Sequence, residues 1–389
     1  MMVRKFQPSG NTIINQLPSI NHMANELLYQ LSLTLVPNIG DVHAKILLQH
    51  FGSASAVFNA RQQDLERIEG IGLVRAKSIK DFADFNKAEE EMEFIEKYKI
   101  QTYFLTDADY PKRLLNCYDS PTLLFYKGSA NLNASKVVAI VGTRNHTEYG
   151  KQLTEKLVKD LAQQGITIVS GLAFGIDGIA HKAAIKSGLP TIGVVGHGLD
   201  KIYPAEHTSL AKDMIKQEGG ILSEFFSNTK PDKHNFPLRN RIVAGISDAT
   251  VVVETNVKGG SMITAKLADA YNRDVFTFPG RITDNKSSGC NYLIKNNKAI
   301  LLTDADELLD VMGWKEKTKP KSKKQKELFI ELTPEERTIV QLLQQKETMH
   351  IDEINLLCSL NSSVVAAAIL NLELQNVVAS LPGKRYQLL

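Results

Sequence analysis

VVAIVGTR, residues 137–144, is the stretch that decides the fold of the central part of this chain. Its five consecutive apolar residues predict a buried β-strand, and the glycine, hydroxyl and arginine that follow predict a tight turn. Three more segments are interpreted in the same way: ITIVSGLAFGID (166–177), FPLRNR (236–241) and VVVETNVKGGSMITA (251–265). A glycine turn leading into a helix presents backbone N–H groups and a positive dipole end, and arginine pairs with phosphate oxygens. The pattern therefore predicts that the centre of the protein binds phosphate groups.

Strands and helices alternate from residue 103 to residue 314. The predicted strands, rich in Val and Ile, lie at residues 137–141, 167–169, 191–195, 220–223, 250–254, 275–278 and 299–302. Amphipathic helices are predicted between most of them, at residues 150–164, 176–187, 205–217 and 261–271. Apolar strands separated by helices are typical of a buried parallel sheet with right-handed crossovers. We therefore predict an α/β domain with an extended Rossmann-like, doubly wound parallel sheet, whose ligands bind at the carboxyl ends of the strands.

A small all-α domain is predicted at residues 26–102, after a polar extension (1–25) that we expect to be disordered. Two segments within this domain, VPNIGDVHAKILL (36–48) and IEGIGLVRAKSIK (68–80), match the helix-hairpin-helix pattern. In that pattern a glycine turn presents backbone N–H groups to a phosphate. These turns either contact DNA without sequence preference or only shape a protein-interaction bundle, and both interpretations stay open.

The carboxyl-terminal part, residues 329–389, follows a lysine-rich linker predicted at residues 315–328. Three helices and a strand–turn–strand, VVASLPGKRYQLL (377–389), predict a winged-helix domain. The helix in the recognition position, 362–375, contains no Lys or Arg, whereas a helix in the major groove needs basic and polar side chains. A protein-interaction module is therefore favoured over a reader of DNA sequence.

The composition of the 389 residues is ordinary for a globular protein, with 43% hydrophobic and 23% charged residues. A net charge of +3 means that any basic patch has to be local. The three cysteines, Cys117, Cys290 and Cys358, lie far apart and are expected to be buried reduced thiols, so no metal site is predicted. No run of about eighteen apolar residues and no apolar signal segment occurs, so we expect a cytoplasmic protein without a membrane partner.

The turn Gly142-Thr143-Arg144 differs from a dinucleotide-binding loop, because Arg144 takes the place of the second glycine. No nicotinamide or other cofactor is therefore predicted, and a single phosphate is expected at this turn. Asp177 and His181 lie one helical turn apart, but no nucleophile accompanies them, and we expect structural roles for both.

The segment KHNFPLRNR (233–241) places cations around an aromatic ring, as single-stranded nucleic acid requires. Phe236 could instead belong to the core, since residues 242–244 look like the start of a buried helix. Arg239 and Arg241 would be costly to bury unpaired. Together the motifs give these candidate DNA-binding residues: Gly142, Thr143, Arg144, Ser170, Gly171, Lys233, Phe236, Arg239, Asn240, Arg241, Gly259, Gly260, Ser261 and Thr264.

The order of the motifs GTR, SGLAxGID, GLDxxYP (198–204), FPxRNR, GGSxxTA and FPG closely resembles the DNA-processing protein A family, DprA or Smf, over residues 103–314. The flanking domains match a common layout of that family more loosely. The resemblance implies a homodimer, joined through its Rossmann domains, that binds single-stranded DNA without known catalysis. It further implies protection of incoming DNA and loading of a RecA-type recombinase in natural transformation. By motif it places phosphate binding on Arg144, and DNA contacts on Lys233 and Phe236.

A nucleotide-processing hydrolase of the related Rossmann class with a PGGxGT loop is the alternative. The loop at Gly259 is superficially similar to that motif. However, no proline precedes the glycines and no glutamate follows Thr264 by one helical turn. The acid that such chemistry uses is therefore missing from its expected place.

Overall fold

The computed structural model describes residues 18–315 and 332–389, with side chains described from residue 26 onward. The chain divides into two compact units, residues 1–94 and 95–389, which are taken separately below. Most of the predicted extension (1–25) and of the predicted linker (315–328) falls outside the described residues. Within the extension, however, helix α1 already begins at Pro18.

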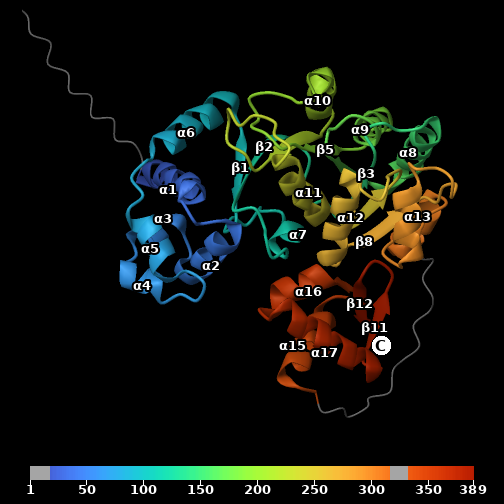
Figure 1. The fold of residues 1–389 in the computed structure, drawn as a ribbon. Helices are drawn as coiled ribbons and strands as arrows, with labels where there is room; N and C mark the ends of the chain where they lie inside the picture. The colour runs from blue at the N-terminus through green and yellow to red at the C-terminus, as the bar shows by residue number, and fades with distance from the viewer. Residues whose placement is uncertain (1–17, 316–331) are drawn as a thin grey trace, which may run out of the picture. The chain divides into compact units, whose positions relative to one another are not determined.

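The described part of the first unit is helical, as the sequence predicts (Figure 1). Its helices are α1 (Pro18–Leu35), α2 (Asp41–Phe51), α3 (Ala54–Asn59), α4 (Gln62–Glu66), α5 (Gly72–Lys80) and α6 (Asn86–Tyr98), the last of which crosses the boundary between the units. The two predicted helix-hairpin-helix segments end in α2 and α5, each entered through a glycine, Gly40 and Gly72. Leu31, Leu47 and Leu65 are completely buried and form part of the core.

The second unit is built on a sheet of nine described strands. They are β1 (Gln101–Phe104), β2 (Leu123–Gly128), β3 (Val137–Val141), β4 (Thr167–Ser170), β5 (Thr191–Val194), β6 (Gly220–Ser223), β7 (Ala249–Val252), β8 (Asp274–Thr277) and β9 (Ile300–Leu301). Their order across the sheet is β1-β2-β6-β5-β4-β3-β7-β8-β9. The strands from β6 to β9 are parallel, so the predicted doubly wound parallel sheet is confirmed.

Two strands were not predicted, because the prediction named only the strands of the parallel array. β2 pairs antiparallel with β6, and β1 pairs antiparallel with β2 at the edge of the sheet. The residues of β1 are mostly exposed or half-buried, so this edge strand lacks the continuous apolar run of an inner strand. The sheet is therefore mixed, and it extends beyond the parallel array on the side of β6.

Helices cover both faces of this sheet (Figure 1). They are α7 (Lys112–Leu115), α8 (Glu148–Asp160), α9 (Ile176–Lys186), α10 (Thr208–Lys216), α11 (Asn235–Ile246), α12 (Gly260–Ala270), α13 (Ser288–Lys295) and α14 (Ala305–Val311), with 3-10 turns at Ala162–Gln164 and Ala205–His207. Alternate β3 residues, Val138 and Ile140, belong to a core shared with α8, α9 and α14. The residues between them point to the opposite face, where α11 and α12 lie side by side.

The segment FPLRNR was predicted to follow a strand, and the structure corrects this. Helix α11 begins at Asn235, before the segment, so Phe236 and Pro237 lie in its first turn. Proline is tolerated there because the N–H groups of the first turn have no partner within the helix. The predicted helix start at residue 242 lies instead in the buried second half of α11.

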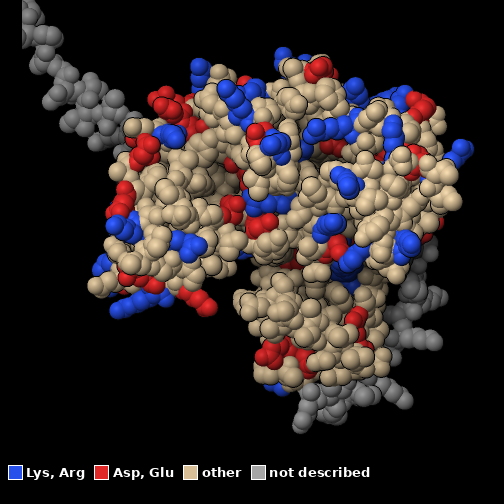
Figure 2. Space-filling model, viewed as in Figure 1, with Lys and Arg blue, Asp and Glu red and all other residues tan. Residues whose placement is uncertain are grey.

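The carboxyl-terminal part is a winged helix, as predicted. Its elements are α15 (Pro334–Gln345), β10 (Met349–His350), α16 (Ile351–Cys358), α17 (Ser362–Leu374), β11 (Val378–Leu381) and β12 (Arg385–Leu388). The short strand β10, which was not predicted, pairs with β12 at one edge of the wing. A capping box of Thr333 and Glu336 starts α15. Much of the surface around α16 is uncharged in Figure 2.

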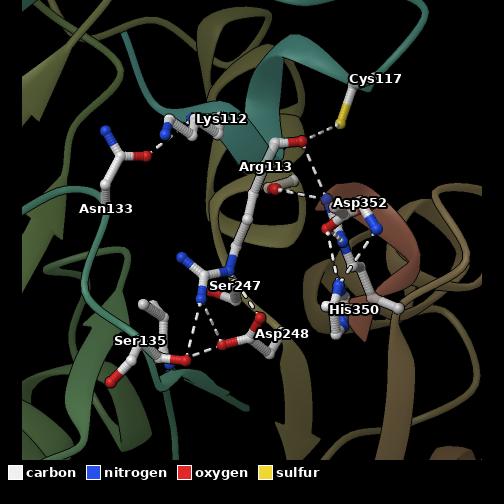
Figure 3. A network of polar contacts seen from close by, with 12 residues as sticks. Lys112, Arg113, Cys117, Asn133, Ser135, Ser247, Asp248, His350 and Asp352 are labelled. Carbon is white, nitrogen blue, oxygen red and sulfur yellow. Dashed lines mark hydrogen bonds and ion pairs between the residues drawn. The ribbon is translucent and has the colours of Figure 1, made fainter. Parts of the chain in front are cut away.

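A polar network ties the elements together at the amino ends of the parallel strands (Figure 3). Arg113 of α7 pairs with Asp248, with Nε 2.6 Å from Oδ1 and Nη2 2.8 Å from Oδ2. Asp248 directly precedes β7 and also accepts a hydrogen bond from the backbone N–H of Val137, the first residue of β3. Arg273, directly before β8, pairs with Asp352 of α16. The amino ends of the parallel strands are therefore occupied by ion pairs, and the predicted site lies at their carboxyl ends.

Among the described residues, no single helix is long and apolar enough to cross a membrane. In the part of the chain that the structure describes, one pair of helices, α16 and α17, meets the length and composition criteria when taken together, and the pair is bent by 116°.

Candidate nucleic-acid interface

A cleft of about 520 Å³ opens at the carboxyl ends of the parallel strands. From β3 the chain continues through β4 and β5 to β6 on one side, and from β7 through β8 to β9 on the other. The cleft is lined by residues that follow β3 and β7, so it lies at the topological switch point, where ligands of open α/β sheets bind. These predicted site residues line it: Gly142, Thr143, Arg144, Gly171, Lys233, Phe236, Arg239, Asn240, Gly259, Gly260, Ser261 and Thr264.

Arg144 and Phe236 meet at the mouth of the cleft, although they are far apart in the sequence. The guanidinium carbon of Arg144 lies 5.3 Å from the centre of the Phe236 ring, within cation–π distance. Arg144 is exposed and Phe236 is half-buried, so a charged group and part of an aromatic ring are presented together. Lys233, just before α11, is also exposed. In Figure 2, Lys and Arg side chains are spread over the part of the second unit where α8, α9 and α10 are labelled in Figure 1.

Arg239 is a buried cation at the floor of the cleft. Its side chain is almost completely enclosed and donates from Nη1 to the carbonyl oxygen of Val194. Burial lowers the pKa of Arg239 to about 10, and the negative charge of Asp177 opposes this decrease. Arg239 is therefore still charged at neutral pH, and its Nε lacks a hydrogen-bond partner. It places a guanidinium group beneath the cleft, next to the buried carboxyl group of Asp177.

Arg241 lies on the same helix but does not line the cleft. Its guanidinium pairs with the carboxylate of Glu224 and donates to the carbonyl oxygen of Asp119. The side chains of Arg241 and Glu224 are 8% and 11% exposed. Burying this arginine is feasible because it is paired, which the sequence could not show.

The turn into α12 provides backbone donors on the β7 side of the cleft. Gly259 is the N-cap residue of α12 and makes no side-chain cap, so the first N–H groups of the helix have no side-chain acceptor at the cap. The residue Ser261 is 7% exposed, and its Oγ has no hydrogen-bond partner. A helix N-terminus with an unpaired hydroxyl beside it suits an anion. Thr255 and Asn256 also line this side and were not singled out from the sequence, although their place after a predicted strand was a usable signal.

Ser170, the other candidate outside the cleft, is completely buried. Its Oγ donates to the carbonyl oxygen of Ile140 at 2.6 Å, which joins β4 to β3. Its neighbour Gly171 does line the cleft.

Asp177 is the acidic residue that lines the cleft, whereas His181 is not among the residues that line the cleft. Burial raises the pKa of Asp177, against the lowering effect of Arg239. His181 is fully buried with Nδ1 2.7 Å from Thr191 Oγ1, and burial lowers the pKa of His181 to about 3. A neutral histidine bonded elsewhere cannot serve Asp177 as a catalytic partner. Over residues 18–315 and 332–389, no group of three His, Cys, Asp or Glu side chains is placed to hold a metal ion.

These features define a class of protein before any comparison. The class is a modular α/β protein, with a Rossmann-like sheet that has a cleft lined by cations at its switch point, a helical domain with the helix-hairpin-helix pattern and a winged helix. The family model of DNA recombination-mediator protein A matches residues 101–313. The models of the DprA winged helix domain and of the helix-hairpin-helix motif match residues 323–384 and 27–91. The chain belongs to the DNA-processing protein A (DprA/Smf) family, as its motifs indicated.

Relatives and solved structures support this assignment. The chain is 35% identical to Protein Smf of Synechocystis sp., over 94% of this chain and 100% of that protein. It is 44% identical to DNA processing protein DprA of Bacillus subtilis, over 52% of this chain and 68% of that protein. The X-ray structure of DprA from Streptococcus pneumoniae matches with a TM-score of 0.62 and 34% identity, covering 72% of this chain and 95% of that one.

Proposed function

We propose that this chain binds single-stranded DNA in the cleft at the switch point and mediates recombination by loading a RecA-type recombinase on it. In this proposal it also protects incoming DNA during natural transformation. Membership of a recombination-mediator family supports the general role. The arrangement of the cleft supports the choice of ligand.

The observation that carries the proposal is the combination of several anion-binding elements with one aromatic ring in a single cleft. Arg144, Lys233 and the start of α12 all border it, and Arg239 lies beneath it. One mononucleotide phosphate would not need them all, whereas a polynucleotide presents successive phosphates. Phe236 beside Arg144 adds a flat apolar face. Stacking on such a face tolerates any base, which favours binding without sequence preference.

The aromatic ring also favours single-stranded over duplex DNA. In a duplex the faces of the bases are stacked on one another, and a ring inside a cleft cannot reach them. In a single strand the bases can turn outward onto an aromatic side chain.

Binding to single- and double-stranded oligonucleotides, titrated with salt, tests the proposal. The double variant Arg144→Ala/Lys233→Ala should raise the Kd for single strands at least about tenfold, since each charge-assisted hydrogen bond contributes roughly 1.5–3 kcal/mol. The slope of log K against log salt should decrease by about 1.4, at roughly 0.7 for each lost phosphate contact. The matched control, Lys159→Ala/Lys186→Ala, removes two exposed lysines from the last turns of α8 and α9. These turns are at the ends of the helices opposite to their first turns, which follow the strands that border the cleft. Equal affinities for the site variant and the wild type would refute the assignment of the cleft.

Recombinase loading, the homodimer joined through the Rossmann domains and the cytoplasmic location are further parts of the proposal. The three cysteines are buried and form no disulfide, as is usual for proteins of a reducing compartment. The mass in solution measures the oligomeric state. The rate at which a RecA-type recombinase begins DNA-dependent ATP hydrolysis on coated single strands, with and without this protein, measures loading.

The hydrolase alternative finds less support in the cleft. Glu254, two residues after β7, is 1% exposed, and both of its carboxylate oxygens accept hydrogen bonds from Thr147. Asp177 is buried beside Arg239, without a histidine partner. We therefore propose that the chain is not an enzyme. Release of free base from nucleoside monophosphates, above the background of an Asp177→Asn variant, would contradict this.

A further inference from the structure

Two exposed aromatic rings that the proposed function does not use stand beside Phe236. Tyr203, in the loop after β5, is 46% exposed, and its ring centre lies 6.0 Å from that of Phe236 at an angle of 30°. Phe174, in the loop after β4, is 43% exposed, and its ring packs against that of His207 at 5.3 Å. Large aromatic side chains of this exposure gain little from folding, because much of each ring remains in water.

Backbone contacts hold the two loops in place. The N–H of Tyr203 donates to Nε2 of the buried His197 at 3.2 Å, and Nδ1 of His197 lies 2.8 Å from the carbonyl oxygen of Gly198. His207, which supports the Phe174 ring, is bound through Nδ1 to the carbonyl oxygen of Leu172 at 2.9 Å. The rings are thus carried by anchored loops.

The three rings surround one small cavity that adjoins the cleft. Phe174, Tyr203 and Phe236 line it together with Arg144 and Arg239. Its volume is about 20 Å³, room for about one water molecule, so no base can enter between the rings. A ligand has to lie on their outward faces.

The order of the strands places the rings of Phe174 and Tyr203 to one side of Arg144, although they share the small cavity with it. The cleft is centred on β3 and β7, whereas Phe174 and Tyr203 follow β4 and β5, the next strands toward β6. Neighbouring strands lie about 4.8 Å apart, so β5 is roughly 10 Å from β3 along the sheet edge. The loops return toward the cleft, because the Tyr203 ring lies 6.0 Å from that of Phe236, and the two rings present separate outward faces on which two different bases can lie.

We propose that Tyr203 and Phe174 form a second base-stacking platform, which binds the unpaired base of a neighbouring nucleotide in the same DNA strand. The platform rests on the proposed function, because it requires a single strand in the cleft. It fixes the direction in which the strand leaves the cleft, over β4 and β5 toward β6. It also divides the roles between two kinds of group: the cations and the start of α12 bind the backbone, and the aromatic rings bind the bases.

Oligonucleotides with and without bases test the platform. Tyr203→Ala should raise the Kd for a thymine oligonucleotide roughly 5- to 150-fold, which corresponds to the ~1–3 kcal/mol of one stacked base at 1.4 kcal/mol per tenfold. Tyr203→Phe keeps the ring and should bind like the wild type. On an oligonucleotide of abasic sites, wild type and Tyr203→Ala should bind equally, since no base remains to stack. Tyr149→Ala, which truncates another ring at 50% exposure, is the matched control and should leave both affinities unchanged.

A spectroscopic signal separates stacking from a general effect on the fold. The chain contains a single tryptophan, Trp314, so Tyr203→Trp adds one reporter at the platform. Its fluorescence should be quenched by a thymine oligonucleotide and not by the abasic one, whereas the wild-type signal should change little. An unchanged Kd in Tyr203→Ala, or the same loss on abasic DNA, would overturn the platform. If Arg144→Ala still weakens binding, the proposed function stands without it, whereas absence of single-strand binding by the wild type would overturn both.

Discussion

Replacing Gly175 by alanine tests how the loop that carries Arg144 is held. Gly175 precedes α9 with φ +79° and ψ −132°, a backbone conformation that glycine adopts readily and other residues do not. A Cβ atom at this position would lie 2.2 Å from the carbonyl oxygen of Thr143 and 2.5 Å from that of Arg144. Both contacts are with backbone, so no side-chain rotation relieves them.

The size of the effect follows from these distances. Moving the new Cβ from 2.2 Å to an ordinary contact distance of 3.4 Å from the Thr143 oxygen requires about 1.2 Å of movement in the loop or in α9. Backbone strain contributes roughly 1–3 kcal/mol, and the two contacts add to it, so we expect a decrease of about 3 kcal/mol in the free energy of unfolding. Because the displaced loop includes Arg144, the Kd for single-stranded DNA should rise about tenfold or more.

Gly188, at the other end of the same helix, provides the matched control. It also has a positive φ, +69°, but a Cβ there would meet nothing within 4 Å. Gly188→Ala should therefore show only backbone strain, about 1–2 kcal/mol, and should bind DNA like the wild type. Thermal unfolding followed by Trp314 fluorescence reports on this domain, since Trp314 packs against the core of the sheet.

Two results would refute this reasoning. If Gly175→Ala and Gly188→Ala lose equal stability and both bind DNA normally, the backbone contacts at Gly175 do not position the Arg144 loop. If Gly188→Ala loses as much DNA affinity as Gly175→Ala, the loss reflects the fold as a whole and not the cleft.

Three further substitutions separate structural from binding roles. Arg241→Met should lower the free energy of unfolding by about 3 kcal/mol, because it leaves Glu224 buried without its arginine, and should keep the Kd for single strands within twofold. A loss of affinity like that of Arg144→Ala would place Arg241 in the interface after all. The pKa of His181 is about 3 in the fold, against about 6.5 in the unfolded chain. The stability that comes with a neutral His181 is therefore complete above pH 6.5 and is lost as the pH falls toward 3. The free energy of unfolding, measured with denaturant between pH 6.5 and 5, should therefore depend less steeply on pH in His181→Asn than in the wild type, by up to about 1.4 kcal/mol per pH unit. An equal pH dependence in the two proteins would disprove this. Thr333→Ala should lower the stability of α15 by about 1 kcal/mol, because it removes the capping box. Amide exchange in α15 should become faster while DNA binding stays unchanged, and unaltered exchange would show that the capping box is not needed.

The sequence was sufficient for most of the fold because the relevant signals are local. The apolar runs of β3 and β7, and the glycines and hydroxyls after them, are consecutive in the chain, so they predict both the strands and the edge that carries the site. The unpredicted elements have weak local signals. β1 is a four-residue strand with little burial, and β10 has only two residues.

The direction of each side chain was not predictable to the same degree. Arg239 and Arg241 are identical residues two positions apart, and the sequence assigned both to DNA. Because α11 begins at Asn235, both lie on a helix, where residues two apart point in nearly opposite directions. One arginine therefore lies beneath the cleft and the other pairs with Glu224.

The sequence alone thus determined that glycine turns and cations gather at the carboxyl ends of a parallel sheet, because that follows from patterns a few residues long. Only the tertiary structure decided which of these groups face one another. The contact of Arg144 with Phe236, and of Phe236 with Tyr203, joins the loops after β3 and β5 to the first turn of α11. Such contacts depend on the order of strands across the sheet, which brings distant segments of the chain to one edge.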